Sequence, residues 1–178
     1  KKADSMELPA RIHLFQGLPK SDKMELIIQK AVELGAYSVI PVAAKRSIVR
    51  LDPKREQARV KRWQAIAESA AKQSKRSIVP EVRPVSGFAD ALKEAAGVAL
   101  SLMPYERAGD MGQTRRLLKT AGPGMDIAVF IGPEGGFEEE EVRQAVEAGV
   151  KPITLGKRIL RTETAGLCVL SALMLLLE

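Results

Sequence analysis

Short apolar runs alternate with segments of helical periodicity along nearly the whole sequence, and this alternation limits the possible folds more than any other feature. A succession of strands and helices is typical of an α/β fold in which a mainly parallel sheet is flanked by helices. No internal repeat, low-complexity tract or interdomain linker interrupts it, so we expect one domain. The apolar runs predict strands over residues 11–16, 37–43, 79–82, 98–103, 126–131 and 152–155.

Helical spacing of apolar residues fills the intervals between these runs. Gly35 and Gly149 stand where helices should end, and Ser86 stands where a helix should be capped. The last helix holds the longest apolar run, which is too short to span a bilayer, so we expect a buried helix with Cys168 in the core. The predicted helices cover residues 20–34, 53–74, 86–95, 112–120, 138–148 and 162–177.

The chain has one cysteine and one histidine, which excludes an intrachain disulfide, a cysteine-based zinc site and a His-x-x-Glu-His metal site. A Ser-His-Asp triad would have to use His13, and no Gly-x-Ser-x-Gly motif is present, so we expect His13 to pack in or beside the first strand. Aromatic residues make up only 4%, which disfavours a protein that stacks single-stranded bases. No signal peptide is visible, and we expect a cytoplasmic protein.

Positive charge is concentrated in residues 54–76, which hold eight basic and two acidic side chains. This excess of six equals the net charge of the whole chain, +6, so the remainder is neutral in sum. A local excess of this kind indicates a face that contacts phosphates. The alternative is a solvated helix face that only keeps the protein soluble.

The first of two glycine loops, residues 132–136, directly follows a predicted buried strand. It is neither a P-loop nor a Gly-x-Gly-x-x-Gly motif. Four glutamates, residues 138–141, open the next helix and would repel a phosphate there, so the loop favours a neutral or cationic ligand held by backbone groups. The alternative is a tight loop without a ligand.

The second loop, residues 155–164, also follows a strand and precedes the last helix, which Thr162 or Thr164 could cap. The alternative here is an ordinary helix start with a surface ion pair between Arg161 and Glu163. Both loops lie at the carboxyl ends of strands, the edge where open α/β sheets bind ligands. Two such loops at one edge favour a binding site.

These loops carry a family resemblance. The segments 132–137 and 155–165 resemble the ribosomal RNA small subunit methyltransferase E family, which belongs to the SPOUT superfamily of trefoil-knot methyltransferases. Further blocks of the resemblance are residues 18–20, 23–25, 30–35, 46–47, 62–63, 66–67, 70–71, 73–74, 76 and 78–80.

The resemblance implies a C-terminal trefoil knot formed by the two glycine loops, and a homodimer with the knot at its interface. It implies S-adenosylmethionine as the methyl donor, N3 of one uridine in 16S rRNA of the small ribosomal subunit as the acceptor, and no metal or membrane. The family carries an N-terminal PUA-like barrel, and we expect residues 1–178 to be the methyltransferase domain without that barrel. Two alternatives remain: a knotted methyltransferase acting on tRNA or ribose 2′-oxygens, and a non-catalytic RNA-binding ribosome-assembly factor.

The resemblance also implies roles for individual residues. Arg161 would stabilise negative charge on the uracil oxygens. Glu163 and Glu134 are candidates for a base or for positioning, and an ion pair of Glu163 with Arg161 that shapes the knot is the alternative. Residues expected to bind the cofactor are Leu102, Met103, Pro104, Ile131, Gly132, Pro133, Gly135, Leu155, Gly156, Ile159, Leu160 and Thr164. Residues expected to bind RNA are Arg46, Arg55, Arg59, Arg62, Lys72 and Arg76.

Overall fold

The sheet is parallel at every strand pairing of the computed structural model, which describes residues 5–48 and 52–178. Its strands are β1 (Arg11–Gly17), β2 (Ser38–Ala43), β3 (Glu81–Val82), β4 (Ser86–Gly87), β5 (Leu100–Pro104), β6 (Asp126–Ile131) and β7 (Lys151–Ile153). The strand order is β3-β2-β1-β6-β5-β7, and β4 pairs with the end of β2. The mainly parallel α/β fold is therefore confirmed.

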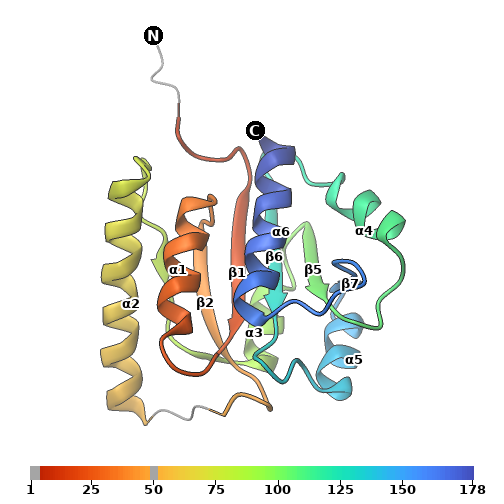
Figure 1. Cartoon of the computed structure of the whole chain (residues 1–178), viewed down its shortest axis with the longest axis horizontal. Helices are drawn as coiled ribbons and strands as arrows, with labels where there is room; N and C mark the ends of the chain where they lie inside the picture. Colours follow the sequence, from red (N-terminus) through yellow and green to blue (C-terminus); the bar gives the residue numbers. More distant parts are fainter. Residues whose placement is uncertain (1–4, 49–51) are drawn as a thin grey trace.

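Helices cover both faces of this sheet (Figure 1). They are α1 (Lys23–Glu33), α2 (Pro53–Gln73), α3 (Phe88–Ala95), α4 (Met111–Leu118), α5 (Glu139–Glu147) and α6 (Thr162–Leu177). The buried side chains of α1, α2 and α6 share one apolar core, and those of α3 and α5 share another. None of the helices in residues 5–48 and 52–178 combines the length and apolar character needed to cross a membrane.

Period-two alternation along the strands produces the two cores. Leu14 of β1 points into the core under α1, α2 and α6, whereas its neighbour Phe15 points into the other. There Phe15 stacks on Phe130 of β6 with ring centroids 4.5 Å apart. Helix ends also follow the sequence, since Gly35 and Gly149 have φ values of 92° and 93°.

Two local expectations are wrong. Ser86 does not cap α3, because Ser86 and Gly87 pair with Val42 and Ala43 as strand β4, and the helix begins only at Phe88. The last helix is not buried all round. Only one of its faces enters the core, and Cys168 is exposed on the other. The run is apolar on both faces, so periodicity does not reveal which face is covered.

The carboxyl ends of β1, β6, β5 and β7 meet at one edge of the sheet. Gln16 of β1 is in register with Ile131 of β6, and Pro104 of β5 is in register with Ile153 of β7. The segments that leave these strands are therefore neighbours, although they are far apart in the sequence. This edge holds both glycine loops.

Candidate active site between two glycine loops

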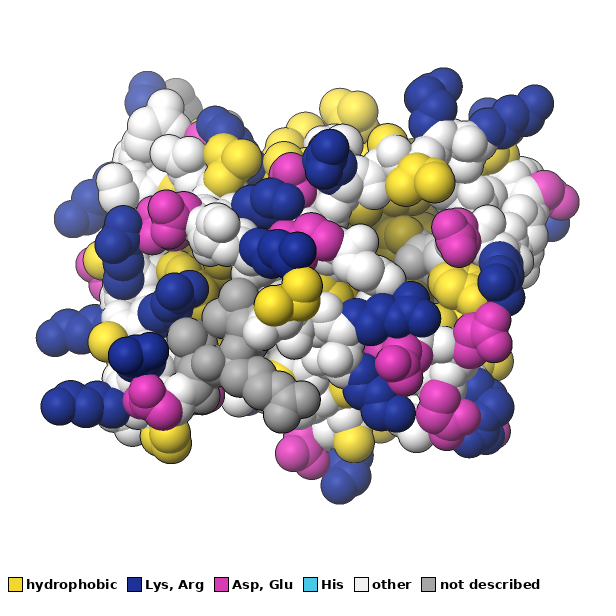
Figure 2. Space-filling view, turned by 60° about the horizontal axis from the view of Figure 1, so that its bottom comes forward, with side chains coloured by type: hydrophobic (Ala, Val, Ile, Leu, Met, Phe, Trp, Pro, Cys, Tyr) yellow, Lys and Arg dark blue, Asp and Glu magenta, His cyan; other side chains and the backbone are white. Residues whose placement is uncertain are grey.

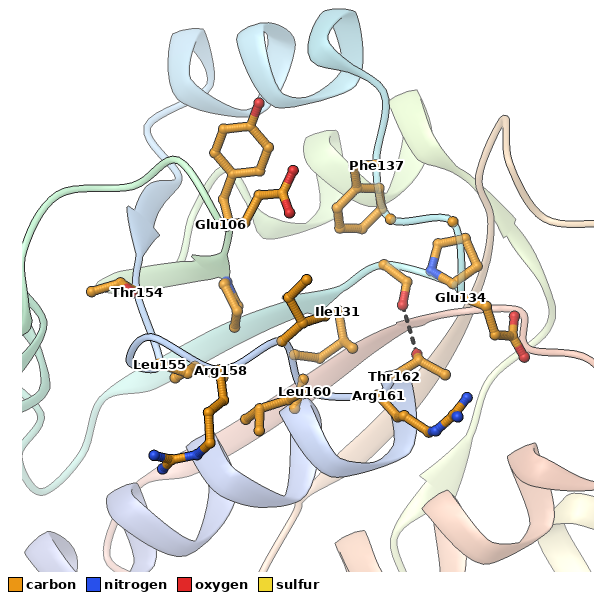
Figure 3. Close-up of a pocket in the computed structure, with 18 of the residues that line it drawn as sticks. Glu106, Ile131, Glu134, Phe137, Thr154, Leu155, Arg158, Leu160, Arg161 and Thr162 are labelled. Atoms are coloured by element: carbon orange, nitrogen blue, oxygen red, sulfur yellow. Dashed lines mark hydrogen bonds between the residues drawn. The ribbon is translucent and has the colours of Figure 1, made fainter.

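A cavity of about 650 Å³ opens at this edge, between the two glycine loops and the segment that follows β5 (Figure 3). The two loops predicted to form one site are thus brought together. The predicted residues that line the cavity are Pro104, Ile131, Gly132, Pro133, Glu134, Gly135, Leu155, Gly156, Ile159, Leu160 and Arg161, together with Arg46 from the predicted RNA-binding set.

The first loop turns back sharply on itself. The Gly136 amide donates a 2.8 Å hydrogen bond to the Pro133 carbonyl, and Gly136 has a φ of 70°. A Cβ on Gly132 would lie 3.0 Å from the backbone of Gly136, so a side chain there would force the turn open. The glycines therefore leave main-chain groups facing the cavity.

A buried hydrogen-bond relay joins the two loops. The Gln16 side-chain amide donates to the Gly17 carbonyl at 2.9 Å and to the Thr162 hydroxyl at 2.8 Å. The Thr162 hydroxyl donates in turn to the Gly132 carbonyl at 2.6 Å, the bond dashed in Figure 3. Gln16 is fully buried, and its Oε1 has no hydrogen-bond partner among the described residues. Nothing in the sequence pattern singled out Gln16.

Helix α6 does not begin with a threonine cap, so that expectation is wrong. Arg161 occupies the cap position and makes no side-chain cap bond, while its carbonyl accepts the amides of Thr164 and Ala165. The Thr162 hydroxyl is engaged by Gly132 instead. Thr164 is exposed and is not among the residues that line the cavity.

Glu134 extends from the first loop, and Figure 3 shows its side chain on the same side of the cavity as Arg161. One of its oxygens, Oε1, accepts the Lys20 amide at 2.8 Å and the Lys23 ammonium at 3.2 Å. Burial raises the pKa of Glu134, but these donors outweigh it and hold the pKa below its ordinary value. Glu134 is therefore an anion and a weak base.

Glu163 faces Lys23 rather than Arg161. Its Oε2 lies 3.9 Å from the Lys23 Nζ and is buried without a hydrogen-bond partner among the described residues. No ion pair joins Glu163 to Arg161, so that alternative is wrong. Glu163 is also absent from the cavity lining, whereas Lys23 is part of it. Lys23 stands in a block that carries the family resemblance, but nothing in the sequence gave it a role.

Two arginines at the mouth of the cavity, Arg46 and Arg161, differ in whether the guanidinium already has a partner in the protein. The Arg46 guanidinium donates to the Gly135 carbonyl at 2.8 Å, and its stem packs where a Cβ on Gly135 would lie, 3.3 Å away. Arg46 therefore supports the first loop from outside. Arg161 makes no ion pair with any described residue, which leaves its charge available to a ligand.

The far wall differs from the sequence expectation. The side chains of Leu102 and Met103 are fully buried in the two cores on opposite faces of the sheet, and they do not line the cavity. Pro104 does line it, and Tyr105 and Glu106 extend the wall without having been predicted. Side chains alternate along β5, so Leu102 and Met103 point to opposite faces of the sheet and neither reaches the edge where the cavity opens.

Ile159 and Leu160 were expected to pack or to line a pocket. Both line the cavity, but Ile159 is 89% exposed and Leu160 is half-buried. Ile159 therefore forms an open lip rather than an inner wall.

Most of the basic residues chosen as RNA contacts are exposed on α2, and Figure 2 shows Lys and Arg side chains gathered where α2 lies. Arg59 and Lys72 are exposed without an ion pair to a described residue. Arg55 pairs with Asp52 at 3.4 Å, and Arg62 pairs with Glu25 at 2.7 Å.

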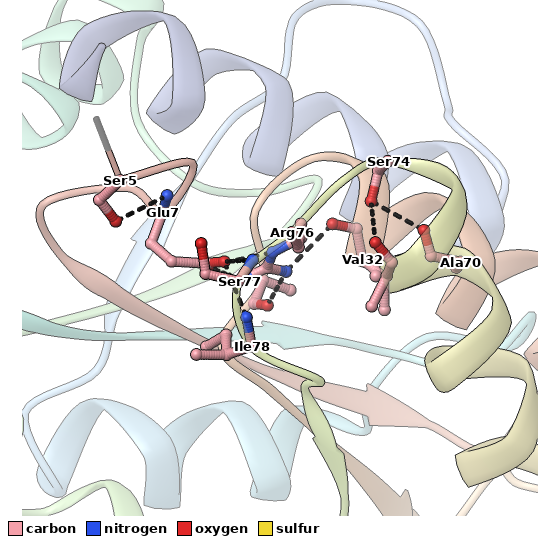
Figure 4. Close-up of polar contacts among 10 residues, drawn as sticks. Ser5, Glu7, Val32, Ala70, Ser74, Arg76, Ser77 and Ile78 are labelled. Carbon is pink, nitrogen blue, oxygen red and sulfur yellow. Dashed lines mark hydrogen bonds and ion pairs between the residues drawn. The ribbon is translucent and has the colours of Figure 1, made fainter. Parts of the chain in front are cut away.

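Arg76 is a structural residue, and its assignment to RNA is wrong. Its side chain is 4% exposed, pairs with Glu7, and donates to the carbonyls of Val32 at 3.1 Å and Ala36 at 2.6 Å (Figure 4). The guanidinium thus ties the segment before β1 to the end of α1. A run of basic residues in the sequence does not reveal that its last member, which follows the end of α2, turns inward.

His13 lies in β1, as expected. Its Nδ1 lies 2.7 Å from the Ser38 hydroxyl and its Nε2 lies 2.8 Å from Asp126. These residues lie toward the amino ends of β1, β2 and β6, opposite the cavity, and Ser38 is buried. The arrangement has the residue types of a hydrolytic triad without a nucleophile that a substrate could reach.

Comparison with known proteins agrees with this site. Residues 6–174 match the family model for an RNA methyltransferase domain, so the fold and site define an RNA methyltransferase. The ribosomal RNA small subunit methyltransferase E of Bacillus subtilis is 40% identical over 96% of this chain and 68% of its own length. That of Mesomycoplasma hyopneumoniae is 34% identical over 90% and 68%. The chain belongs to the ribosomal RNA small subunit methyltransferase E family and is a methyltransferase.

Two solved structures with bound S-adenosylmethionine are also similar to this chain. The Neisseria gonorrhoeae ribosomal RNA small subunit methyltransferase E, bound to S-adenosylmethionine, superposes with a TM-score of 0.84 at 42% identity, over 97% of this chain and 69% of that one. A Legionella pneumophila structure with bound S-adenosylmethionine superposes with a TM-score of 0.87 at 34% identity, over 95% and 67%. The chain thus spans about two thirds of the length of these relatives.

Proposed function

We propose that this chain is the catalytic domain of a cytoplasmic enzyme that methylates N3 of a uridine in 16S ribosomal RNA, with S-adenosylmethionine as the donor. The observation that carries the proposal is the single cavity lined by both glycine loops, in a chain whose solved relatives bind this cofactor. S-adenosylmethionine supplies a methyl group on a positively charged sulfur.

The cavity fits such a cofactor. Main-chain groups of Gly132, Gly135 and Gly156 line it where no Cβ intervenes, and the apolar side chains of Ile131 and Leu155 lie between them. Backbone groups on the two loops would hold the polar parts, and Pro104, Tyr105 and Phe137 would cover the adenine. The four glutamates at and after the cap of α5 make this edge unsuitable for a polyphosphate.

We also propose that the two loops form a trefoil knot. Strand β7 pairs with β5 at the edge of the sheet, whereas α6 returns to pack on β1 and β6. The segment between them must therefore cross the ends of β5 and β6, where the Thr162–Gly132 hydrogen bond holds it against the first loop. An experimental structure in which this segment passes outside the first loop would contradict the knot.

Uracil N3 must lose its proton to become a nucleophile. The Arg161 guanidinium, which has no ion-pair partner among the described residues, would stabilise the negative charge that then develops on the uracil oxygens. Glu134 is a weak base, and Glu163 does not line the cavity, so we assign both carboxylates to positioning and the proton to solvent at the open mouth. If either carboxylate were the acceptor, its glutamine variant would lose the pH dependence of methyl transfer.

A homodimer belongs to the same proposal. Leu175 is 74% exposed and Leu176 is 49% exposed on α6, and Cys168 of the same helix is also exposed. An apolar strip on a protein surface marks a partner site, and a second copy of the chain presents the complementary strip. Light scattering should give twice the chain mass for the wild type and a smaller mass for Leu175→Glu. A wild type at the mass of one chain would contradict the dimer, and equal masses at twice the chain mass would show that the dimer does not use this strip.

The decisive experiment is methyl transfer from labelled S-adenosylmethionine to small ribosomal subunits that lack the modification, followed by mass spectrometry of the nucleosides. We expect label in 3-methyluridine of 16S rRNA. Label in a ribose 2′-oxygen or in tRNA would replace the proposed acceptor, and RNA binding without any transfer would indicate a non-catalytic factor.

A further inference from the structure

Lys23, the first residue of α1, stands between the two glycine loops without belonging to either. Its ammonium lies 3.2 Å from Oε1 of Glu134 in the first loop and 3.9 Å from Oε2 of Glu163 at the start of α6. Its side chain also lines the cavity and is 31% exposed. One cation thus faces one carboxylate from each loop.

Two hydrogen bonds hold the Glu134 carboxylate at its end of this bridge. Glu134 Oε1 also accepts the Lys20 amide at 2.8 Å, so α1 and the turn before it hold the first loop by two donors. The Arg46 bond to the Gly135 carbonyl is a further contact that holds the same loop. These contacts hold the first loop in place, so Lys23 can position Glu163 relative to that loop.

The Glu163 side depends on Lys23 alone. Glu163 Oε2 is buried and accepts no hydrogen bond from any described residue, and Lys23 is its ion-pair partner. The other charged residues that line the cavity are Arg46, Glu106, Glu134, Lys157, Arg158 and Arg161. Without the ammonium, two carboxylates would face each other at the junction of the loops, and like charges at that range repel.

Arg161 directly precedes α6, two residues before Glu163, so a shift of Glu163 would move the backbone that carries the guanidinium at the mouth. A displacement of about 1 Å in a group that contacts the reacting atoms costs on the order of 100-fold in rate. The bridge therefore bears on catalysis even though Lys23 belongs to neither loop.

We propose that Lys23 is a positioning residue that bridges Glu134 and Glu163 and thereby sets Arg161 relative to the first glycine loop. This role rests on the proposed methyl transfer for its consequence in catalysis, whereas the bridge itself is a property of the folded chain. The two parts can be tested separately.

The first test compares methyl-transfer kinetics of Lys23→Met, Lys23→Arg and the wild type. Lys23→Met should lower kcat about tenfold or more while KM for S-adenosylmethionine stays within about twofold, because Lys23 lines the cavity beside Glu134 and is not among the residues proposed to hold the cofactor. Lys23→Arg should recover most of kcat, since it restores the cation. The matched control is Lys30→Met, which removes a lysine of the same helix whose side chain is 41% exposed and pairs with Glu33.

An unchanged kcat in Lys23→Met, or a Lys23→Arg variant as slow as Lys23→Met, would overturn the positioning role. A fall in kcat equal to that of Lys30→Met would do the same. If the wild type transfers no methyl group, the proposed function fails and the second test decides the bridge.

The second test needs neither cofactor nor RNA. Urea unfolding of Lys23→Met, Glu163→Gln and the double variant forms a double-mutant cycle. A bridge predicts that the double variant is no less stable than Lys23→Met, because Glu163→Gln removes the carboxylate that Lys23→Met leaves unpaired. Strictly additive losses of stability would show that Lys23 and Glu163 do not interact, and would overturn the bridge.

Discussion

The hydroxyl of Thr162 donates a 2.6 Å hydrogen bond to the carbonyl oxygen of Gly132, and the two residues are 30 positions apart in the chain. The same hydroxyl accepts the buried side-chain amide of Gln16. One oxygen atom therefore joins β1, the first glycine loop and the first turn of α6. Because Gln16 is fully buried, bulk solvent cannot replace the hydroxyl as the partner of its side-chain amide.

Thr162→Val removes this hydroxyl with little change of shape. It leaves the Gly132 carbonyl and one Gln16 amide hydrogen without partners, so we expect a loss of about 2 kcal/mol in the free energy of unfolding in urea. Thr162→Ser keeps the hydroxyl and should lose less. Equal stability of the two variants would show that the relay contributes nothing.

Arg161→Ala tests the assigned stabiliser of the uracil anion. Removing a donor aimed at developing charge should lower methyl transfer by about 100-fold, while the affinity for S-adenosylmethionine changes little. Calorimetry on the same preparation gives the affinity, and Arg161→Lys shows whether charge alone suffices. Undiminished turnover in Arg161→Ala would remove Arg161 from the mechanism.

The Glu7–Arg76 pair predicts an acid-sensitive stability. Burial raises the pKa of Glu7, but the Arg76 guanidinium and the amides of Ile78 and Ser77 outweigh it and lower the pKa below the ordinary 4.5. A lowered folded-state pKa stabilises the protein fully above about pH 4.5, and this contribution is lost as the pH falls through the folded value.

Glu7→Gln should therefore cost about 3 kcal/mol at pH 7 and flatten the fall of stability in acid, because Arg76 is left buried without its anion. Thermal unfolding from pH 7 to pH 3 measures both effects. Glu33→Gln, at an exposed pair with Lys30, is the control and should change stability by less than about 1 kcal/mol. A Glu7→Gln profile parallel to the wild type would contradict the prediction.

The basic face of α2 predicts a charge-dependent affinity for RNA. Arg59→Ala and Lys72→Ala each remove an exposed cation. Each should reduce the slope of the logarithm of RNA affinity against the logarithm of salt concentration by about one. Lys93→Ala removes the same charge from α3, on the opposite face of the sheet, and should leave the slope unchanged. Equal slopes for all three variants would place RNA elsewhere.

The sequence predicted most elements because their signals are local. Helix α6 and strand β6 have the predicted bounds, since apolar periodicity and flanking glycines decide them. The prediction that Ser86 caps a helix was wrong because the residue pairs with β2, and that contact is not local in the sequence. The prediction that Cys168 lies in the core was wrong because the sequence of an apolar helix does not reveal which of its faces is covered.

The site was predicted as two loops but not as a network. Glycines after strands mark the loops, whereas Gln16 and Lys23 act through partners far along the chain, which no spacing rule connects. Arg76 shows the same limit. Its place in a basic segment of the sequence suggests RNA binding, whereas its burial and its ion pair with Glu7 show that it stabilises the fold. Residues whose role depends on a tertiary contact need the structure.

Calorimetry of S-adenosylmethionine binding to the wild type, Gly132→Ala and Gly97→Ala tests the central claim most directly. A Cβ on Gly132 would press on the backbone of Gly136, whereas one on Gly97 meets nothing within 4 Å. We expect one cofactor per chain for the wild type and Gly97→Ala, with binding at least about tenfold weaker for Gly132→Ala. No binding by the wild type at millimolar cofactor, or equal affinity of all three proteins, would contradict a cofactor site between the two glycine loops.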